Sequence, residues 1–248
     1  MCPLFVYLAA LFFLPASCVL ADEQDKPFAV VELFSSEGCS SCPAADLLVS
    51  KLTAWARQNN KPVYPLIFHV DYWNGLGWRD TFSNPLFTQR QKEYAKVFRD
   101  QGVYTPEMIV NGSDAFAGAD NDRLQKNLEQ ELAAQVNVSL NISLKKQGNQ
   151  VLIKYSAEGF MDGDLINFAL VERGLTTDVV TGENAGRTLH HDNVVREFRT
   201  KPISDVEGSL SMPLNKISDL TQASLIAYIQ NPQTMLIEDA KQIDLAND

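Results

Sequence analysis

The sequence predicts two domains of different fold class: an α/β domain over residues 22–135 and an all-β, sandwich-like domain over residues 136–248. In the first range, apolar runs of strand length alternate with helical patterns, which is typical of a parallel sheet. From residue 136 onward, apolar and polar residues alternate with a period of two, which is typical of antiparallel strands. A chain of 248 residues is also long enough for two ordinary domains.

Residues 1–21 are predicted to be a signal peptide. Residues 1–20 carry no charged side chain, residues 4–14 form an apolar run, and residues 19–21 fit a cleavage site. The alternatives are a lipid anchor on Cys18 and a retained helix. Cleavage after Ala21 would leave a periplasmic or secreted chain with no transmembrane span.

The α/β prediction begins with a strand–helix–strand unit. Residues 28–34 are apolar and rich in β-branched and aromatic side chains, which indicates a buried strand. Residues 42–57 place an apolar stripe at helical spacing, with Pro43 in the first turn, where no helical hydrogen bond is lost. Residues 62–70 form a second apolar run, so the unit is expected to be a right-handed parallel crossover.

A hairpin and two more helices are expected to complete this domain. Asn84 and the proline after it favour the start of a helix that runs to Phe98. The Asn-Gly pair at 111–112 is a strong hairpin signal between two short apolar runs. Residues 121–134 carry leucines at intervals of four, which indicates a third helix.

The second range is predicted to hold seven short strands, as a β-sandwich does. Residues 136–144 alternate between apolar and polar side chains, and a turn at 147–149 leads into a second alternating strand. The further strands are expected at residues 166–172, 194–199, 210–214, 224–230 and 235–240.

Composition excludes several classes of function. The formal net charge is −10 with only 21 Lys and Arg, which argues against binding to nucleic acids or to an anionic membrane surface, because both require basic side chains. Cleavage after Ala21 would remove two of the four cysteines and leave only Cys39 and Cys42. One closely spaced pair closes a very small loop, so it is better explained by chemistry than by stabilisation of the fold.

The Cys39–Cys42 pair is the main candidate site. Cys39 is expected at the mouth of a helix that follows a buried strand, where the helix dipole and free N–H groups stabilise a thiolate. Cys42, one turn along, can resolve a mixed disulfide, which is the chemistry of thiol–disulfide exchange. The alternative is a structural zinc site, whose remaining ligands would come from His69, His190 and His191.

The order of Glu32, Cys39, Cys42 and Thr105-Pro106, followed by a strand, resembles the thioredoxin superfamily. This resemblance implies that the α/β domain is thioredoxin-like. It also implies that Pro106 is cis, that the backbone of Thr105 pairs with a peptide substrate, and that Glu32 assists proton transfer to Cys42. The alternative for Pro106 is an ordinary trans bond before a strand. The alternative for Glu32 is a partly solvated structural role.

Three stretches resemble the secreted DUF1223 family, whose function is unknown. They are Phe-Ser-Ser-Glu-Gly-Cys-Ser-Ser-Cys-Pro at 34–43, His-Val-Asp-Tyr-Trp at 69–73 and Gly-Arg-Thr-Leu-His-His-Asp-Asn-Val-Val at 186–195. These stretches span both predicted domains. Two features differ from thioredoxin: Gly38 stands where thioredoxin has a tryptophan, and the residues between the cysteines are two serines.

Residues at the end of the second strand are further candidates. The ends of neighbouring parallel strands lie at the same edge of a sheet, so His69, Asp71 and Trp73 are expected beside Cys39. Asp71 and His69 could tune the thiols, and Trp73 could contact substrate together with Trp78. His69 could equally be packed and inert. The adjacent His190 and His191 point to opposite faces of a strand, which favours a loop or interface role over metal chelation.

The leading hypothesis is an exported thiol–disulfide oxidoreductase that needs no cofactor or metal. Its partners would be protein thiols or disulfides, together with a redox partner in the cell envelope. The alternative is a redox-inactive binding or scaffold protein of the envelope with a permanently closed disulfide. A thiol peroxidase is a third hypothesis, which lacks an arginine near the motif to polarise a peroxide.

Overall fold

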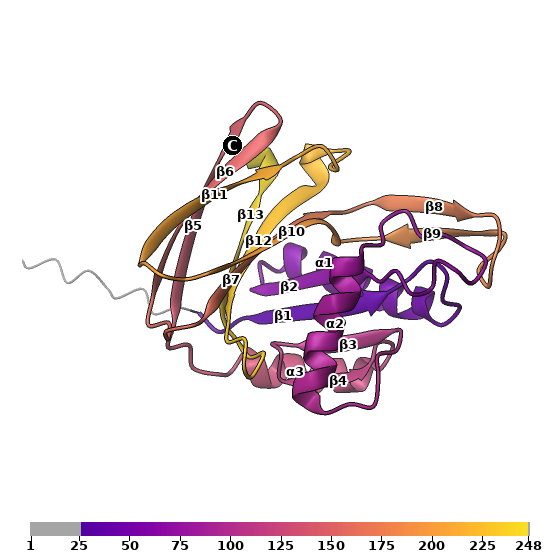
Figure 1. Cartoon of the computed structure of the whole chain (residues 1–248), viewed down its shortest axis with the longest axis horizontal. Coiled ribbons are helices and arrows are strands. Elements are labelled where there is room, and N and C mark those ends of the chain that lie inside the picture. The colour runs from indigo at the N-terminus through magenta and orange to yellow at the C-terminus, as the bar shows by residue number, and fades with distance from the viewer. Residues whose placement is uncertain (1–25, 248) are drawn as a thin grey trace, which may run out of the picture.

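The computed structural model describes residues 26–247, which contain three α-helices, thirteen strands and two short 3-10 helices (Figure 1). The predicted signal peptide and the alternative lipid anchor on Cys18 lie outside the described residues. In chain order the elements are β1 Ala29–Ser35, α1 Cys42–Gln58, β2 Val63–His69, α2 Pro85–Phe98, β3 Glu107–Val110, β4 Asp114–Ala117, α3 Asn121–Glu131, β5 Ser139–Gln147, β6 Gln150–Glu158, β7 Leu165–Glu172, β8 Leu175–Val179, β9 Arg187–His191, β10 Val194–Pro202, β11 Glu207–Pro213, η1 Leu220–Gln222, β12 Ala223–Gln230, β13 Ile237–Asp244 and η2 Leu245–Asn247.

Eight of these strands form one mixed sheet in the order β13-β12-β7-β10-β2-β1-β3-β4. The parallel pairing of β1 with β2 confirms the predicted crossover, and β3 and β4 form the hairpin expected at residues 111–112. The second edge of β2 pairs with β10, where Ile67 lies opposite Val194 and its N–H donates to the carbonyl of Asn193 at 2.9 Å. This junction joins strands from both predicted ranges in one sheet.

The predicted fold class, an α/β thioredoxin-like domain plus an all-β sandwich-like domain, is therefore wrong. The described chain is mostly β, with a large mixed sheet and only three α-helices, and has no helix-rich α/β domain at its N-terminal end. The prediction failed because hydrophobic periodicity shows that a strand is buried, without showing which strand pairs with it. The boundary between residues 22–135 and 136–248 stays a prediction.

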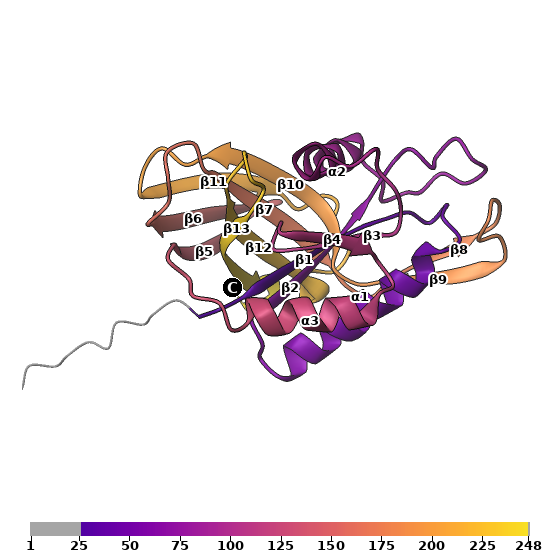
Figure 2. The same ribbon diagram turned by 90° about the horizontal axis from the view of Figure 1, so that it is seen from below.

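Helices cover both faces of the β1–β2–β3 part of the sheet. Figure 2 shows α2 on one side and α1 and α3 on the other. Side chains alternate along a strand, so Val30 and Phe34 of β1 pack with Tyr94 of α2, whereas Leu33 packs with Val49 of α1. The face to which a β1 side chain points therefore decides whether it can reach α1 and its cysteines.

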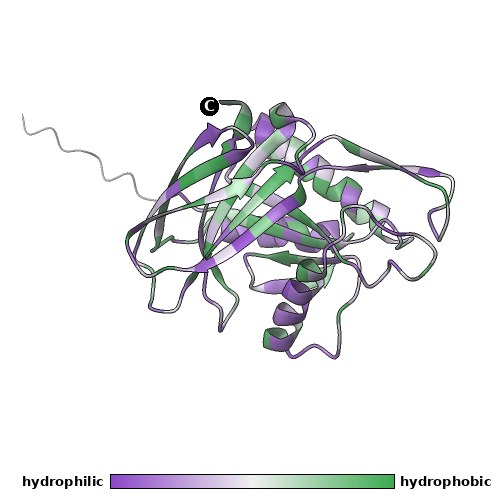
Figure 3. Ribbon diagram, turned by 45° about the horizontal axis from the view of Figure 1, so that its top comes forward, coloured by the Kyte–Doolittle hydropathy of each residue, from purple (hydrophilic) through white to green (hydrophobic). Residues whose placement is uncertain are grey.

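The remaining strands form a second layer. A three-stranded sheet in the order β11-β6-β5 packs on the face of β7 and β12, with Leu140 and Ile153 against Phe168 and Leu225. Apolar residues are concentrated along these strands in Figure 3. The alternation predicted for this region is confirmed. The strands expected from residue 166 onward are confirmed as β7, β10, β11, β12 and β13.

The sequence patterns did not reveal the two-stranded hairpin β8–β9. It extends from the main sheet to the edge where β1 and β2 end, and it lies beside the start of α1 (Figure 1). None of the helices in residues 26–247 is long and apolar enough to cross a membrane.

Candidate functional site

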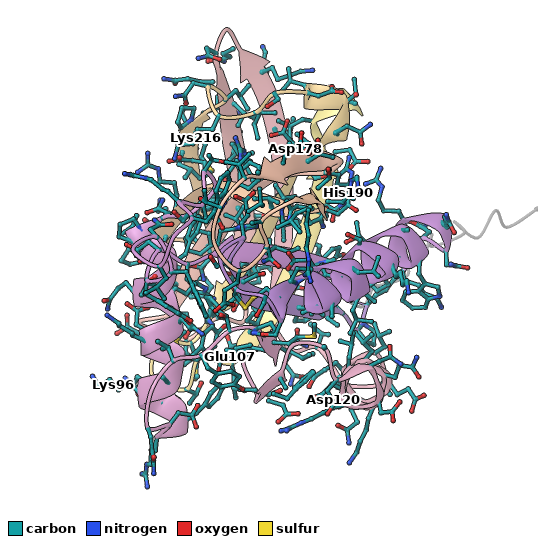
Figure 4. The ribbon with its side chains drawn as sticks, turned by 90° about the vertical axis from the view of Figure 1, so that its right-hand side faces the viewer. Lys96, Glu107, Asp120, Asp178, His190 and Lys216 are labelled. Atoms are coloured by element: carbon teal, nitrogen blue, oxygen red, sulfur yellow. A yellow bond between two sulfur atoms is a disulfide. The ribbon has the colours of Figure 1, made fainter. Side chains whose placement is uncertain are left out.

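The two cysteines lie at the start of α1, at the end of β1. Cys39 is in the turn before the helix and Cys42 is its first residue, and the two form a disulfide with a Cα–Cα distance of 5.4 Å (Figure 4). The N–H of Cys42 donates to the carbonyl of Cys39 at 3.2 Å. The expected place of the motif at a helix N-terminus is confirmed. Its accessibility differs from the expectation, because Cys39 is 1% exposed and Cys42 is 0% exposed.

The tip of the β8–β9 hairpin holds the backbone of the cysteine motif. The side-chain amide of Asn184 donates to the carbonyl oxygens of Glu37 at 2.8 Å and Cys39 at 2.9 Å. The N–H of Ser40 donates to a carboxylate oxygen of Glu183 at 3.0 Å, and the side chain of Ser40, together with this N–H, lowers the pKa of Glu183. The carboxylate of Glu183 therefore binds a backbone N–H group beside the N-terminus of α1, where an anion is favoured.

Thr105, Pro106 and Trp73 lie beside the motif. The Thr105–Pro106 peptide bond is cis, as the resemblance implied. The indole N–H of Trp73 donates to the hydroxyl of Thr105 at 2.8 Å, and a Cβ on Gly38 would lie 3.2 Å from the Cβ of Trp73. A Cβ on Gly118 would lie 2.8 Å from Pro106 and 3.1 Å from Ala45 of α1, so Pro106 borders the first turn of the cysteine helix.

Asp71 is engaged by α2. Its carboxylate accepts from the hydroxyl of Thr88 at 2.5 Å, and its N–H donates to the same hydroxyl at 3.1 Å. These bonds tie the loop after β2 to α2. They do not link Asp71 to the cysteines, so its predicted role in tuning the thiols has no support from its contacts.

Glu32 points away from the cysteine helix. It faces α2, where the guanidinium of Arg90 donates to its two carboxylate oxygens at 2.9 and 3.0 Å. The hydroxyls of Tyr94 and Tyr228 also donate to this carboxylate, the latter at 2.8 Å. Arg90 lies over several aromatic rings, including that of Phe68 at 5.7 Å. Glu32 is thus the centre of a buried ion pair that ties α2 to β1 and β12, and the structure does not bring it to Cys42.

A different set of ionisable side chains includes residues on both sides of the motif in the sequence. This buried acid–histidine cluster consists of Glu37, Asp46, His69, Asp80 and His191, all of them buried. Asp46 lies one helical turn after Cys42, and its two carboxylate oxygens lie 2.7 Å from the hydroxyl of Ser35 and 3.2 Å from Nδ1 of His191. Nε2 of His191 lies 3.5 Å from a carboxylate oxygen of Glu37.

The second histidine of the cluster is held by Asp80. One carboxylate oxygen of Asp80 lies 2.6 Å from Nδ1 of His69 and accepts from the N–H of Glu37 at 2.9 Å. The rings of His69 and His191 are 5.0 Å apart and nearly perpendicular. Within residues 26–247, no three His, Cys, Asp or Glu side chains are arranged to hold a metal ion.

Burial and charge act in opposite directions on His191. Burial lowers its pKa, and the carboxylates of Asp46 and Glu37 raise it, with a net pKa of about 9. At Asp80, burial raises the pKa, but the imidazole of His69 and the N–H groups of Glu37 and Phe82 together lower it overall. The cluster therefore carries a histidine that holds a proton at neutral pH.

Sequence reasoning singled out His69 and missed most of this cluster. His191 was correctly expected to point away from His190, and it is buried whereas His190 is exposed. Two signals were available: Asp46 is four residues after Cys42, on the same face of the helix, and Glu37 is two residues before Cys39. The contribution of β9 could not be predicted, because its hairpin was not recognised.

A family model described as a protein of unknown function, DUF1223, matches residues 30–230. The structure is similar to that of protein AGR_C_4864 from Agrobacterium tumefaciens, with 29% identity, a TM-score of 0.65 and coverage of 89% of this chain and 95% of that chain. More distant similarities are to OgpA from Akkermansia muciniphila (6% identity, 46% and 30% coverage, TM-score 0.30) and to a domain of the outer membrane lipoprotein Omp28 from Porphyromonas gingivalis (14% identity, 44% and 88% coverage, TM-score 0.25). No curated protein matches the chain. Because the family model covers most of its length, the chain belongs to the DUF1223 family.

Proposed function

We propose that this protein is a thiol–disulfide oxidoreductase that uses Cys39 and Cys42 as its exchanging pair. The observation that carries the proposal is the disulfide at the N-terminus of α1, in a segment whose neighbouring residues Glu37 and Asp46 belong to a buried acid–histidine cluster. A disulfide that only stabilised the fold would have no need of ionisable groups in the neighbouring sequence, and burying such groups costs stability. The short loop between the cysteines also limits what the disulfide can add to stability.

The proposed substrates are thiols and disulfides of other proteins. When the Cys39–Cys42 pair is reduced, a substrate thiolate attacks Sγ of Cys39, and the Cys39–Cys42 bond breaks with its electrons passing to Cys42. A second substrate thiolate then attacks the substrate sulfur of the mixed disulfide and releases Cys39. The substrate leaves oxidised and the pair is left reduced, so two electrons have moved.

Access to Cys39 requires the hairpin tip to move in this proposal. Asn184 and Glu183 hold the backbone of the motif, and Cys39 is 1% exposed while they do so. The contacts at the tip are a few hydrogen bonds, each with a net worth of about 0.5–1.5 kcal/mol. A local opening of this size is small beside the stability of a whole domain.

Location in the periplasm or outside the cell is part of the proposal. Disulfides persist in oxidising compartments and are uncommon in the cytosol. The proposed likeness to the thioredoxin superfamily is restricted to one local arrangement, which consists of β1, the cysteine motif, the start of α1 and Thr105–Pro106. An envelope redox partner would reset the pair after each exchange.

The burial of Cys39 favours a second candidate function. A sulfur that never becomes accessible would suit a redox-inactive scaffold, in which the disulfide holds the start of α1 and the hairpin binds a partner. The two candidates differ in one property, which is whether the pair can be reduced while the protein stays folded.

Trapping and turnover assays test the oxidoreductase. The Cys42→Ser protein should accumulate mixed disulfides with substrate proteins that carry disulfides, because Cys39 attacks a substrate sulfur and no resolving thiol remains. The Cys39→Ser protein should trap none and should not reduce insulin. Equal, negligible trapping by both variants in folded protein would favour the scaffold.

A further inference from the structure

Two carboxylates hold His191 on opposite sides, and both belong to segments that carry the cysteines. Asp46 is one turn after Cys42 on the buried side of α1, and it lies 3.2 Å from Nδ1 of His191. Glu37 is two residues before Cys39 and lies 3.5 Å from Nε2. His191 thus contacts one carboxylate from the segment before Cys39 and one from the first turns of the helix that Cys42 begins.

Several polar atoms of the cluster have no well-formed hydrogen bond in the oxidised protein. Both ring nitrogens of His191, Nε2 of His69 and one carboxylate oxygen of Glu37 are buried without a hydrogen bond of good geometry. Buried polar groups are rarely left so, because each costs free energy. Groups that bind or release protons during a reaction are one reason for a protein to keep them.

The charges that face His191 come from several elements. Asp46 is on α1, Glu37 is in the turn after β1, and His69 at the end of β2 is paired with Asp80. Phe82 closes the remaining side against both imidazole rings, and the guanidinium of Arg196 lies over the far face of that phenyl ring. Apart from Arg196, the surroundings of His191 are carboxylates and a second imidazole, which suit a group that holds a proton.

We propose that His191 is the proton-relay residue of the Cys39–Cys42 pair, and that it exchanges its proton with Cys42 through Asp46. This inference rests on the proposed function. His191 is a positioning residue in this scheme, because it acts on Cys42 through Asp46, which is four residues after Cys42 on the buried side of the same helix.

The proton balance follows the electrons. When a substrate protein's thiolate attacks Cys39, Cys42 leaves with the electron pair of the broken bond as a thiolate in a buried site. Burial disfavours the charge, so Cys42 takes up a proton that His191 gives up through Asp46, and the neutral His191 then regains a proton from solvent. In the opposite direction, Cys42 gives up its proton along the same path before it attacks Cys39.

A measurable consequence is the pH dependence of the rate at which dithiothreitol reduces the pair. Each rate is divided by the fraction of dithiothreitol present as thiolate, because the thiolate is the nucleophile. The corrected rate should be constant while His191 holds its proton and should fall about tenfold per pH unit above about pH 9, where the proton that Cys42 needs is lost. Without the histidine, the corrected rate should be lower at neutral pH and nearly independent of pH.

The experiment compares the full chain with His191→Gln and Asp46→Asn, and uses His190→Gln as the matched control. His190 is the neighbouring residue on β9, is exposed and lies outside the cluster (Figure 4). Alkylation of the freed thiols at timed intervals gives the rate at each pH. A corrected rate that falls above about pH 9 in the parent and in His190→Gln, with a lower and flat profile in the other two variants, supports the relay. The same fall in all four proteins, or a flat profile in the parent, overturns the relay while the oxidoreductase stands.

Nuclear magnetic resonance gives a test that needs no folded variant of the cluster. The chain has three histidines, so the imidazole signals of the parent protein can be resolved and followed against pH in the oxidised and reduced states. The titration of His191 should differ between the two states, and identical curves overturn the relay. A pair that dithiothreitol cannot reduce in the folded protein would end the proposed function as well.

Discussion

Replacing Asn184 with alanine should make the disulfide react faster. The side chain donates to the carbonyls of Glu37 and Cys39 at 2.8 and 2.9 Å and holds the hairpin tip on the motif. Two such bonds are worth about 2 kcal/mol together. If the tip must open before a reductant reaches Cys39, this loss raises the open population by about 30-fold.

The assay is the rate of reduction by excess dithiothreitol, followed by alkylation of the freed thiols. Thr188→Ala is the matched control, because its hydroxyl bonds Asp178 at 2.6 Å within the same hairpin and away from the motif. The control should react like the parent protein, and Asn184→Ala up to about 30-fold faster. Equal rates for all three folded proteins would refute the view that the hairpin tip restricts access.

The remaining predictions concern stability. The pKa of His191 in the folded protein is about 9, above its ordinary value of 6.5. Its protonation therefore stabilises the folded state fully below about pH 6.5, and this stabilisation is lost as the pH rises through 9. Chemical unfolding of the oxidised protein should show that the free energy of unfolding falls by about 3 kcal/mol over this range, and His191→Gln should not show this fall. Glu32→Gln leaves the buried charge of Arg90 without its partner, so the free energy of unfolding measured in urea should fall by about 3–5 kcal/mol. The pH profile of disulfide exchange should stay that of the parent protein. Gly112→Ala should lower the thermal midpoint by many degrees, because φ is +66° and the new Cβ would lie 1.8 Å from the carbonyl oxygen of Met235; an unchanged midpoint would contradict the packing described at this turn.

Local structure was predictable wherever the signal lies within a short stretch of sequence. The β1–α1–β2 crossover, the turn at 111–112 and the alternating strands after residue 136 all follow from periodicity and turn chemistry. The place of Cys39 and Cys42 at the start of a helix follows from the same reasoning. These features depend on neighbours a few residues apart.

The overall sheet was not predictable from such patterns. β2 pairs with β10, and nothing in the apolar run of either strand specifies the other. The same limitation explains Glu32, whose position on β1 was correct but whose partner Arg90 comes from α2 on the opposite face from Cys42. Long-range pairing depends on the shape of the assembled core, which a single periodic pattern does not encode.

The acid–histidine cluster was missed for a related reason. Asp46 and Glu37 are close to the cysteines in sequence, but His191 lies on a hairpin that hydrophobic periodicity does not predict. β8 and β9 are short, and most of their residues are at least partly exposed, so they lack a strong apolar signal.

The central claim is that Cys39 and Cys42 exchange electrons with other thiols in the folded protein, and their reduction potential tests it most directly. The oxidised full chain is equilibrated with buffers of defined thiol–disulfide ratio, and the reduced fraction is measured by alkylation. The account predicts a midpoint between about −270 and −120 mV, with the protein folded at both ends of the titration. A pair that remains oxidised at about −300 mV would contradict the account and leave the disulfide a structural one.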